Sequence, residues 1–262
     1  MQDQLPIGNI PYGLPKYMSP SSIGTFNQCP MRFKFSKLDK IKEPSTEAQV
    51  VGSFVHEVLE LLFDFDPDER TMDNARSIAK NLWHEKWMAE YEQLEEKSDV
   101  NEFRWKVWWC VENYFQLEDP RTLKPGGLED KVEGEIMGVP IFGIIDRWYE
   151  NEDGNIIVSD YKTGKKPRPQ YEWEKKMQIM IYVDLLEAIT GKKAAVGELL
   201  YLKGPSVVKY EATEELRDSV RKTIRNTWDE VIESCSTGEF ECRTGPLCNW
   251  CSFQSICPAW KK

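Results

Sequence analysis

The chain has 262 residues and a net charge of −10, with 34 Lys and Arg against 44 Asp and Glu. This length suffices for one large domain or for a domain with an added lobe, and the 12% of aromatic residues argues against a disordered chain. The negative charge argues against a broad nucleic-acid-binding surface, although basic residues cluster locally at 31–42 and 162–168.

The compartment is indicated by what the sequence lacks. No stretch approaches the roughly 18 apolar residues that span a membrane, and residues 1–18 lack the basic and apolar regions of a secretory signal. We therefore expect a cytoplasmic protein, in which disulfides are rare. Its 7 Cys then require another explanation.

The first half of the chain is predicted to be mainly helical. Residues 1–18 are rich in Pro and Gly and indicate an irregular arm. Ser19 followed by Pro20 is typical of a helix start, so a helix is expected from Ser19 toward Lys37. Apolar residues recur at helical spacing over 49–65, and two more helices are expected within 71–117.

From residue 128 the pattern changes to strands separated by turn residues. The expected elements are strands at 128–137, 139–149 and 156–163, a helix at about 171–190, strands at 194–202 and 206–211, and a helix at 212–234. This order predicts an α/β fold with an arm at 1–18, a mainly helical region at 19–127, a core at 128–236 and a Cys-rich tail at 237–262.

Charged residues follow directly on the apolar strand that begins at Ile156. Asp160 and Lys162 are two residues apart, so their side chains share one face of the strand. Asp146 ends the apolar run of the preceding strand. Two carboxylates and a lysine on adjoining strands suit Mg²⁺ and a phosphodiester. A structural Asp160–Lys162 ion pair is the alternative.

Three further polar residues lie on predicted helices. His56 occurs in GSFVHEVLE, and Gln178 and Tyr182 are four residues apart, so both lie on one helix face. Taken singly, a helical His is more often structural than a metal ligand. Five tryptophans also lie in the helical region, and their spacing favours core packing over base stacking; they are Trp83, Trp87, Trp105, Trp108 and Trp109.

The tail contains a cysteine motif, LCNWCSFQSICP, in which Cys248, Cys251 and Cys257 have the spacing C-x₂-C-x₅-C. In a reduced compartment this spacing is a strong indication of a metal site. The fourth ligand could be Cys242 or Cys29. A four-Cys zinc site and an iron–sulfur cluster both fit such a set.

These motifs together resemble the RecB-like branch of the PD-(D/E)XK nucleases, which includes CRISPR-associated and AddB-like nucleases. The matching pieces are SPSSIGTFNQCPMRFKF, GSFVHEVLE, GIIDRW, VSDYKTGK and QIMIYVDLL, which occur in the family's order between Ser19 and Pro258. The resemblance implies a restriction-endonuclease-like mixed sheet flanked by helices, with a helical insertion and an iron–sulfur tail packing on the N-terminal helix. One departure is Ile145, which stands where the name-giving proline would be.

The resemblance also implies a role for each motif residue. The catalytic residues would be Asp146, Asp160, Lys162, Gln178 and Tyr182; the metal ligands would be His56, Asp146, Asp160 and the backbone carbonyl of Tyr161; and a [4Fe–4S] cluster would be held by Cys29, Cys248, Cys251 and Cys257. Such a cluster would tie both ends of the chain together.

We therefore expect a Mg²⁺- or Mn²⁺-dependent deoxyribonuclease, and the resemblance alone makes it an exonuclease acting on single-stranded DNA ends. The alternative is an iron–sulfur subunit that binds DNA ends for a recombination or CRISPR-adaptation protein, with cleavage secondary. The sequence has no helicase phosphate-binding loop of the form G-x-x-x-x-G-K-[ST], so unwinding would require a partner.

Overall fold

The computed structural model describes residues 11–260, so most of the arm predicted at residues 1–18 lies outside the described residues. The helices are α1 (Pro20–Gln28), α2 (Pro30–Phe33), α3 (Glu47–Phe63), α4 (Met72–Leu82), α5 (Met88–Glu92), α6 (Val100–Leu117), α7 (Trp173–Thr190) and α8 (Glu214–Thr237). The strands are β1 (Pro125–Ile136), β2 (Val139–Glu150), β3 (Ile156–Lys162), β4 (Ala194–Tyr201) and β5 (Ser206–Glu211).

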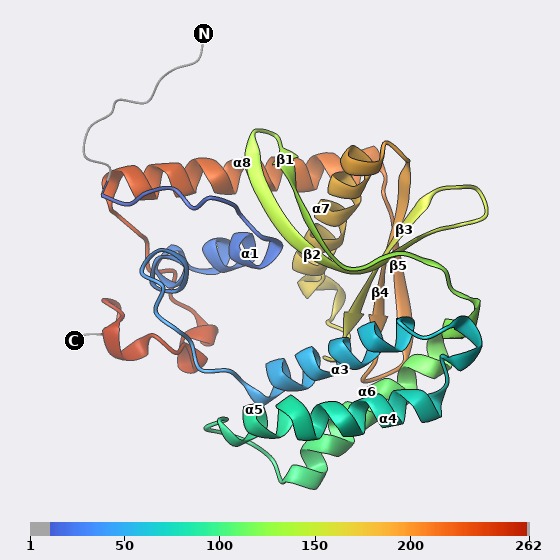
Figure 1. Cartoon of the computed structure of the whole chain (residues 1–262). Helices are drawn as coiled ribbons and strands as arrows, with labels where there is room; N and C mark the ends of the chain where they lie inside the picture. The colour runs from blue at the N-terminus through green and yellow to red at the C-terminus, as the bar shows by residue number, and fades with distance from the viewer. Residues whose placement is uncertain (1–10, 261–262) are drawn as a thin grey trace. The chain divides into compact units, whose positions relative to one another are not determined.

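The strands form one mixed sheet in the order β1-β2-β3-β4-β5 (Figure 1). β3 is antiparallel to β2 and parallel to β4, and β5 is antiparallel to β4. Parallel neighbours need a long crossover, which α7 supplies between β3 and β4 while packing against both. A mixed five-stranded sheet flanked by helices confirms the predicted fold class.

β3 is buried along almost its whole length, because helices cover both of its faces. α7 lies so close to β4 that a Cβ added at Gly197 would stand 2.4 Å from the Ile179 side chain. The other face packs into an apolar cluster built from α3, α4 and α6, which includes Tyr161 of β3 and Leu200 of β4. Residues on this central strand are therefore held firmly, whichever face they point to.

The chain divides into two compact units. Unit 1 comprises Met1–Glu43, Glu133–Phe142 and Asp218–Lys262, and unit 2 comprises Pro44–Val132 and Gly143–Arg217. Within unit 1, Met18 pairs with the tip of the β1–β2 hairpin: its N–H donates to the Pro140 carbonyl at 2.8 Å and its carbonyl accepts from the Phe142 N–H at 3.0 Å. Segments far apart in the sequence thus build unit 1.

The helix expected from Ser19 to Lys37 is wrong in one respect, since it is broken at Cys29. This residue has extended dihedrals (φ −162°, ψ 108°), and a new helical segment begins at Pro30. Proline disfavours the helical conformation in the residue before it, and it is itself suited to the first position of a helix. The break was readable in the dipeptide Cys29-Pro30.

The expectation that the five tryptophans pack in the core is only partly right. Trp83 and Trp87 are buried, but Trp105 is 55% exposed and stacks on Trp109 with ring centroids 4.9 Å apart. None of the helices between residues 11 and 260 combines the length and the apolar character needed to cross a bilayer.

Candidate active site

The polar motif residues of unit 2 come together at the C-terminal end of β3. His56 of α3 faces Asp146 of β2, with Nδ1 3.4 Å from the Asp146 Oδ1. The His56 Nε2 lies 3.1 Å from the Tyr161 carbonyl oxygen, so the ring spans both strands. The other oxygen of Asp146, Oδ2, accepts the Tyr161 N–H at 2.7 Å, which fixes the orientation of the carboxylate.

The register of the sheet explains why the two aspartates are neighbours. Arg147 of β2 pairs with Ser159 of β3, so Asp146 and Asp160 follow on adjacent strands. Lys162 lies two residues beyond Asp160, and its Nζ is 2.5 Å from the Asp160 Oδ2. The strand alternation expected from the sequence is therefore present.

α7 supplies the next part of the site. Lys162 Nζ donates to the Gln178 Oε1 at 3.0 Å, and Gln178 Nε2 donates to the Tyr182 hydroxyl at 3.4 Å. Tyr182 fits only because position 143 is glycine: a Cβ there would stand 2.5 Å from the Tyr182 Cε1. The structure brings together every residue predicted for the metal and catalytic groups.

The electrostatics of the site follow from burial and from crowded opposite charges. Burial alone would lower the pKa of His56, but Asp146 and Glu129 face the ring and raise that pKa to about 10. Burial alone would raise the pKa of Asp146, yet His56 and Lys162 hold it below its ordinary value. The pKa of Asp160 is raised, because burial and Asp146 outweigh Lys162.

Glu129 of β1 was not predicted from the sequence to belong to the site. Its Oε1 is 3.7 Å from the His56 Nδ1. Among the residues the structure describes, His56, Glu129 and Asp146 form the one group of three His, Cys, Asp or Glu residues with ligand atoms all within 4.8 Å of one another. Imidazole nitrogen and carboxylate oxygens converging in this way fit a divalent cation. No sequence spacing indicated that Glu129 would join them.

Lys175 was also missed, although a signal for it existed. It lies on the first turn of α7 and three residues before Gln178, so the two share a helix face. Burial lowers the pKa of Lys175, and the nearby Lys162 lowers it further. The site therefore contains a second amine close to the predicted catalytic lysine.

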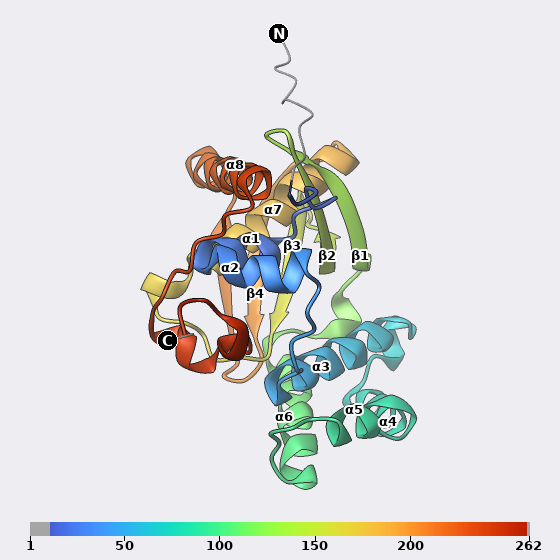
Figure 2. The ribbon, with the colours of Figure 1, turned by 90° about the vertical axis from the view of Figure 1, so that its left-hand side faces the viewer.

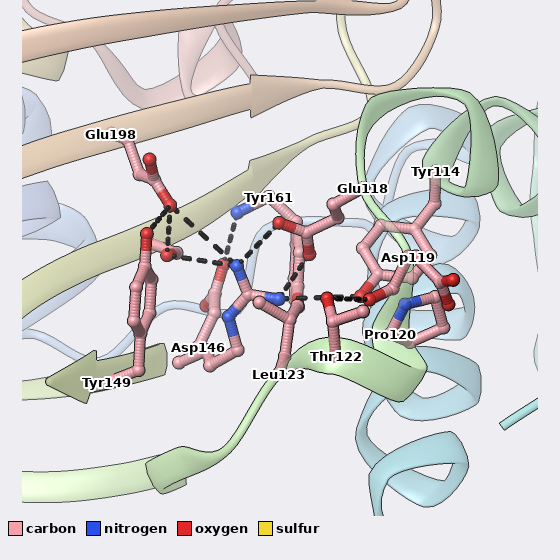
Figure 3. Close-up of polar contacts among 12 residues, drawn as sticks. Tyr114, Glu118, Asp119, Pro120, Thr122, Leu123, Asp146, Tyr149, Tyr161 and Glu198 are labelled. Atoms are coloured by element: carbon pink, nitrogen blue, oxygen red, sulfur yellow. Dashed lines mark hydrogen bonds and ion pairs between the residues drawn. The ribbon is translucent and has the colours of Figure 1, made fainter. Parts of the chain in front are cut away.

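A buried ionic network lies on the opposite face of β2 and β3 (Figure 3). Arg147 is fully buried, and its guanidinium binds both carboxylate oxygens of Glu118 and the Ser159 hydroxyl. Glu198 of β4 lies 3.8 Å from the same guanidinium and accepts from the Ser159 hydroxyl at 2.7 Å. The network ties the end of α6 to the strands that carry Asp146 and Asp160.

Comparison with protein-family models shows which family has this arrangement. The model of the PD-(D/E)XK nuclease superfamily matches residues 17–258. The chain belongs to the PD-(D/E)XK nuclease superfamily. Nucleases of this superfamily use a divalent metal, and the His56, Glu129 and Asp146 group supplies suitable donors.

Individual relatives agree with this membership. The CRISPR-associated exonuclease Cas4/endonuclease Cas1 fusion of Leptospira interrogans is 28% identical over 121 residues, covering 45% of this chain and 22% of that protein. The CRISPR-associated exonuclease Cas4 of Saccharolobus solfataricus is 26% identical over 144 residues, covering 55% of this chain and 60% of that protein. The chain thus spans less than two thirds of the length of these two relatives.

Two other proteins are similar over nearly the whole chain. The gene 69 protein of Mycobacterium phage D29 is 22% identical over 273 residues, covering 93% of this chain and 97% of that protein. A solved structure from Eubacterium rectale has a TM-score of 0.57 at 15% identity, covering 94% of this chain and 87% of that one. The latter is a likeness of fold.

Most cysteines of this nuclease gather in unit 1. Five of them, Cys29, Cys242, Cys248, Cys251 and Cys257, line one cavity of about 240 Å³. The backbone N–H of Met31 donates to the Glu241 carbonyl at 3.0 Å, and the rings of Phe35 and Phe253 lie 5.4 Å apart, so the tail lies against α2 and the turn after it (Figure 2). Cys242 Sγ is 4.0 Å from the Cys257 Sγ. Burial raises the pKa of Cys242, and the neighbouring Cys257 raises it further.

Proposed function

We propose that this chain is a Mg²⁺- or Mn²⁺-dependent exonuclease that hydrolyses single-stranded DNA from its ends. The observation that carries the proposal is the convergence of His56, Asp146, Asp160 and Lys162 at one end of β3. DNA as the substrate class follows from the superfamily. Exonuclease action is supported by the names of the two Cas4 relatives.

Each residue has a separable task in this proposal. A bound divalent cation would polarise the scissile phosphate and lower the pKa of an attacking water. His56, Asp146, Asp160 and the Tyr161 carbonyl would hold that cation, with Glu129 as a further carboxylate donor. The Lys162 ammonium, oriented by Asp160 and Gln178, stands where it can stabilise negative charge developing on the phosphate.

The same proposal includes a [4Fe–4S] cluster held by Cys29, Cys248, Cys251 and Cys257. Its support is chemical and geometric: all four thiols line the one cavity of about 240 Å³, and four thiolates are the usual ligand set of such a cluster. The residues therefore fit the group. Cys242 lines this cavity as well, which leaves one thiol beyond the four that a cluster requires.

A second candidate is a subunit that handles DNA ends for a recombination or CRISPR-adaptation partner. The observation in its favour is that the Leptospira relative carries its Cas4 exonuclease in one chain with a Cas1 endonuclease. In this case cleavage would be slow without the partner, whereas the binding of DNA ends would be strong.

DNA of one sequence would test the proposal in three forms: an end-labelled linear single strand, an internally labelled circular single strand and an end-labelled duplex. We expect mononucleotides or short oligonucleotides from the linear single strand when Mg²⁺ or Mn²⁺ is present, and no product in EDTA. Cleavage of the circular single strand at a similar rate would exclude exonuclease action. Tight binding of linear DNA without turnover would favour the second candidate.

A further inference from the structure

The segment that follows the catalytic strand is rich in exposed cations. We call residues 163–173, which join β3 to α7 and include the first residue of that helix, the basic loop. Lys165, Lys166 and Arg168 in this loop are exposed, and they come within six residues of Lys162. A strand whose scissile phosphate lies at Lys162 would have its neighbouring phosphates within reach of these side chains.

Two prolines hold the first part of the basic loop, up to Arg168, in an extended conformation. Pro167 and Pro169 restrict the residues before them to extended conformations, and Arg168 has φ −68° and ψ 152°. At about 3.1 Å per residue in this conformation, Lys166 and Arg168 are spaced roughly 6 Å apart along the chain. Because this part of the loop is already extended, it loses little conformational freedom when a strand binds.

The loop ends in two exposed aromatic side chains. Tyr171 is 67% exposed and Trp173 is 39% exposed. Tyr171 closes a short turn in which its N–H donates to the Arg168 carbonyl at 2.8 Å, so the backbones of these two residues are held close together. Cations for the backbone and an aromatic face for a base are the two features of a single-strand binding surface.

The other flank of the site has the opposite charge. Glu57, Glu60 and Glu129 line a pocket of about 590 Å³ together with His56. Burial raises the pKa of Glu60, and the neighbouring Glu129 raises it further. Lys86 also lines this pocket, but it is paired with Glu57. Without a bound cation, this flank therefore attracts phosphates less than the basic loop does.

We infer that the basic loop binds the phosphate backbone of a single-stranded DNA substrate on one side of the scissile bond, with Tyr171 stacking on a base. This inference rests on the proposed function, since it assigns a path to the strand that the nuclease cleaves. It also explains how a chain of net charge −10 holds a polyanion: the contact is local and confined to the edge that carries Lys162.

Binding of fluorescein-labelled oligothymidylate in EDTA tests this path without cleavage. The double variant Lys165→Ala/Lys166→Ala should reduce the slope of log affinity against log salt by about 1.4, because each phosphate contact to a single strand contributes about 0.7. The matched control is Lys192→Ala/Lys193→Ala. Those lysines precede β4 beside Ile156, the opposite end of β3 in the parallel register, and removing them changes the net charge equally.

The outcomes separate the inference from the proposed function. An equal effect of the two double variants would mean that the protein's overall charge governs binding, and the inference would fail while the function stood. Wild-type protein that neither binds nor cleaves the linear oligonucleotide would overturn the function itself. Calorimetric titration with Mn²⁺ should give the same affinity for both double variants, because neither pair lies among the metal-binding side chains.

Base stacking is tested separately. Tyr171→Ala should weaken binding by roughly fivefold to a hundredfold, the usual range for one stacked base, while Tyr171→Phe should retain it. The control is Trp105→Ala, which removes the exposed aromatic ring on α6. Loss of binding in Trp105→Ala with full binding in Tyr171→Ala would mean that the DNA binds at α6, and it would overturn the inference.

Discussion

At the scale of single residues, the site depends on Asp160 and Lys162. Asp160→Ala removes a carboxylate from the proposed metal site, and Lys162→Ala removes the charge that would face the phosphate. We expect the first to abolish cleavage and the second to slow it by about 10²–10³-fold. Rates on labelled single strands measure both. Asp153→Ala, an exposed carboxylate in the β2–β3 turn, is the control and should cleave normally. Near-native rates in both site variants would refute the assignment.

Glu129 gives a second prediction at this scale. Glu129→Gln keeps the shape of the side chain but removes an anionic oxygen from the group around His56, so Mn²⁺ affinity should fall by about 10–100-fold. Calorimetry without DNA measures this change. Glu60→Gln is the control, because Glu60 lines the same pocket but lies outside the group. Equal affinities for the two variants would show that Glu129 is not a ligand.

The contrast between Asp160 and Glu129 shows what sequence can predict at the residue scale. Asp160 and Lys162 are related by strand alternation, which is local and can be read directly. Glu129 approaches His56 only because α3 and β1 pack beside each other, and 73 residues separate the two. Its backbone φ of +44° could not be predicted either, because a positive φ is uncommon for a glutamate.

At the scale of elements, the Arg147 network joins α6, β2, β3 and β4. Arg147→Met would leave Glu118 and Glu198 without their buried cation, which should cost about 3–5 kcal/mol of unfolding free energy. Urea denaturation measures the loss. Arg121→Met breaks the exposed pair with Asp119 and should change stability by less than about 1 kcal/mol. A loss no larger than that of the control would mean that Arg147 is not needed to hold these elements together.

The order of the elements was predictable because their signals are local. The alternation of helices and strands, the turns at Gly138 and Gly154, and the helix end at Gly191 all depend on nearby residues, and each of these glycines has a positive φ. The sheet order could not be predicted in this way, and the break at Cys29 had a weaker signal. The first depends on long-range packing, and the second was signalled by Pro30 alone.

At the scale of the whole molecule, the cysteine cavity connects segments more than 200 residues apart. Anaerobically purified protein should be brown and contain about four iron and four sulfide per chain. Cys29→Ser should bleach it as fully as Cys251→Ser and should also lower thermal stability. Iron analysis and visible absorption measure the first effect, and calorimetry measures the second.

Cys242 and Cys110 serve as controls for this prediction. Cys110 is buried in the helical cluster of unit 2, so the Cys110→Ser protein should contain as much iron as the wild type. Cys242→Ser should keep its iron as well, although Cys242 lies in the cavity. A bleached Cys242→Ser beside a brown Cys29→Ser would move the fourth ligand to residue 242, and colourless protein with bound zinc would replace the cluster by a zinc site.

The division into two units has a consequence for biosynthesis. Unit 2 ends at Arg217, so all its residues are synthesised before residues 218–262 of unit 1. Unit 1 cannot be completed until residues 218–262 are synthesised. These residues carry four of the five thiols of the cavity. During that interval Cys29 is the one thiol of the cavity that has been synthesised. Domains generally fold as units, N-terminal first, during synthesis. The part of the chain that carries the candidate active site is therefore synthesised before the part that would receive iron and sulfide.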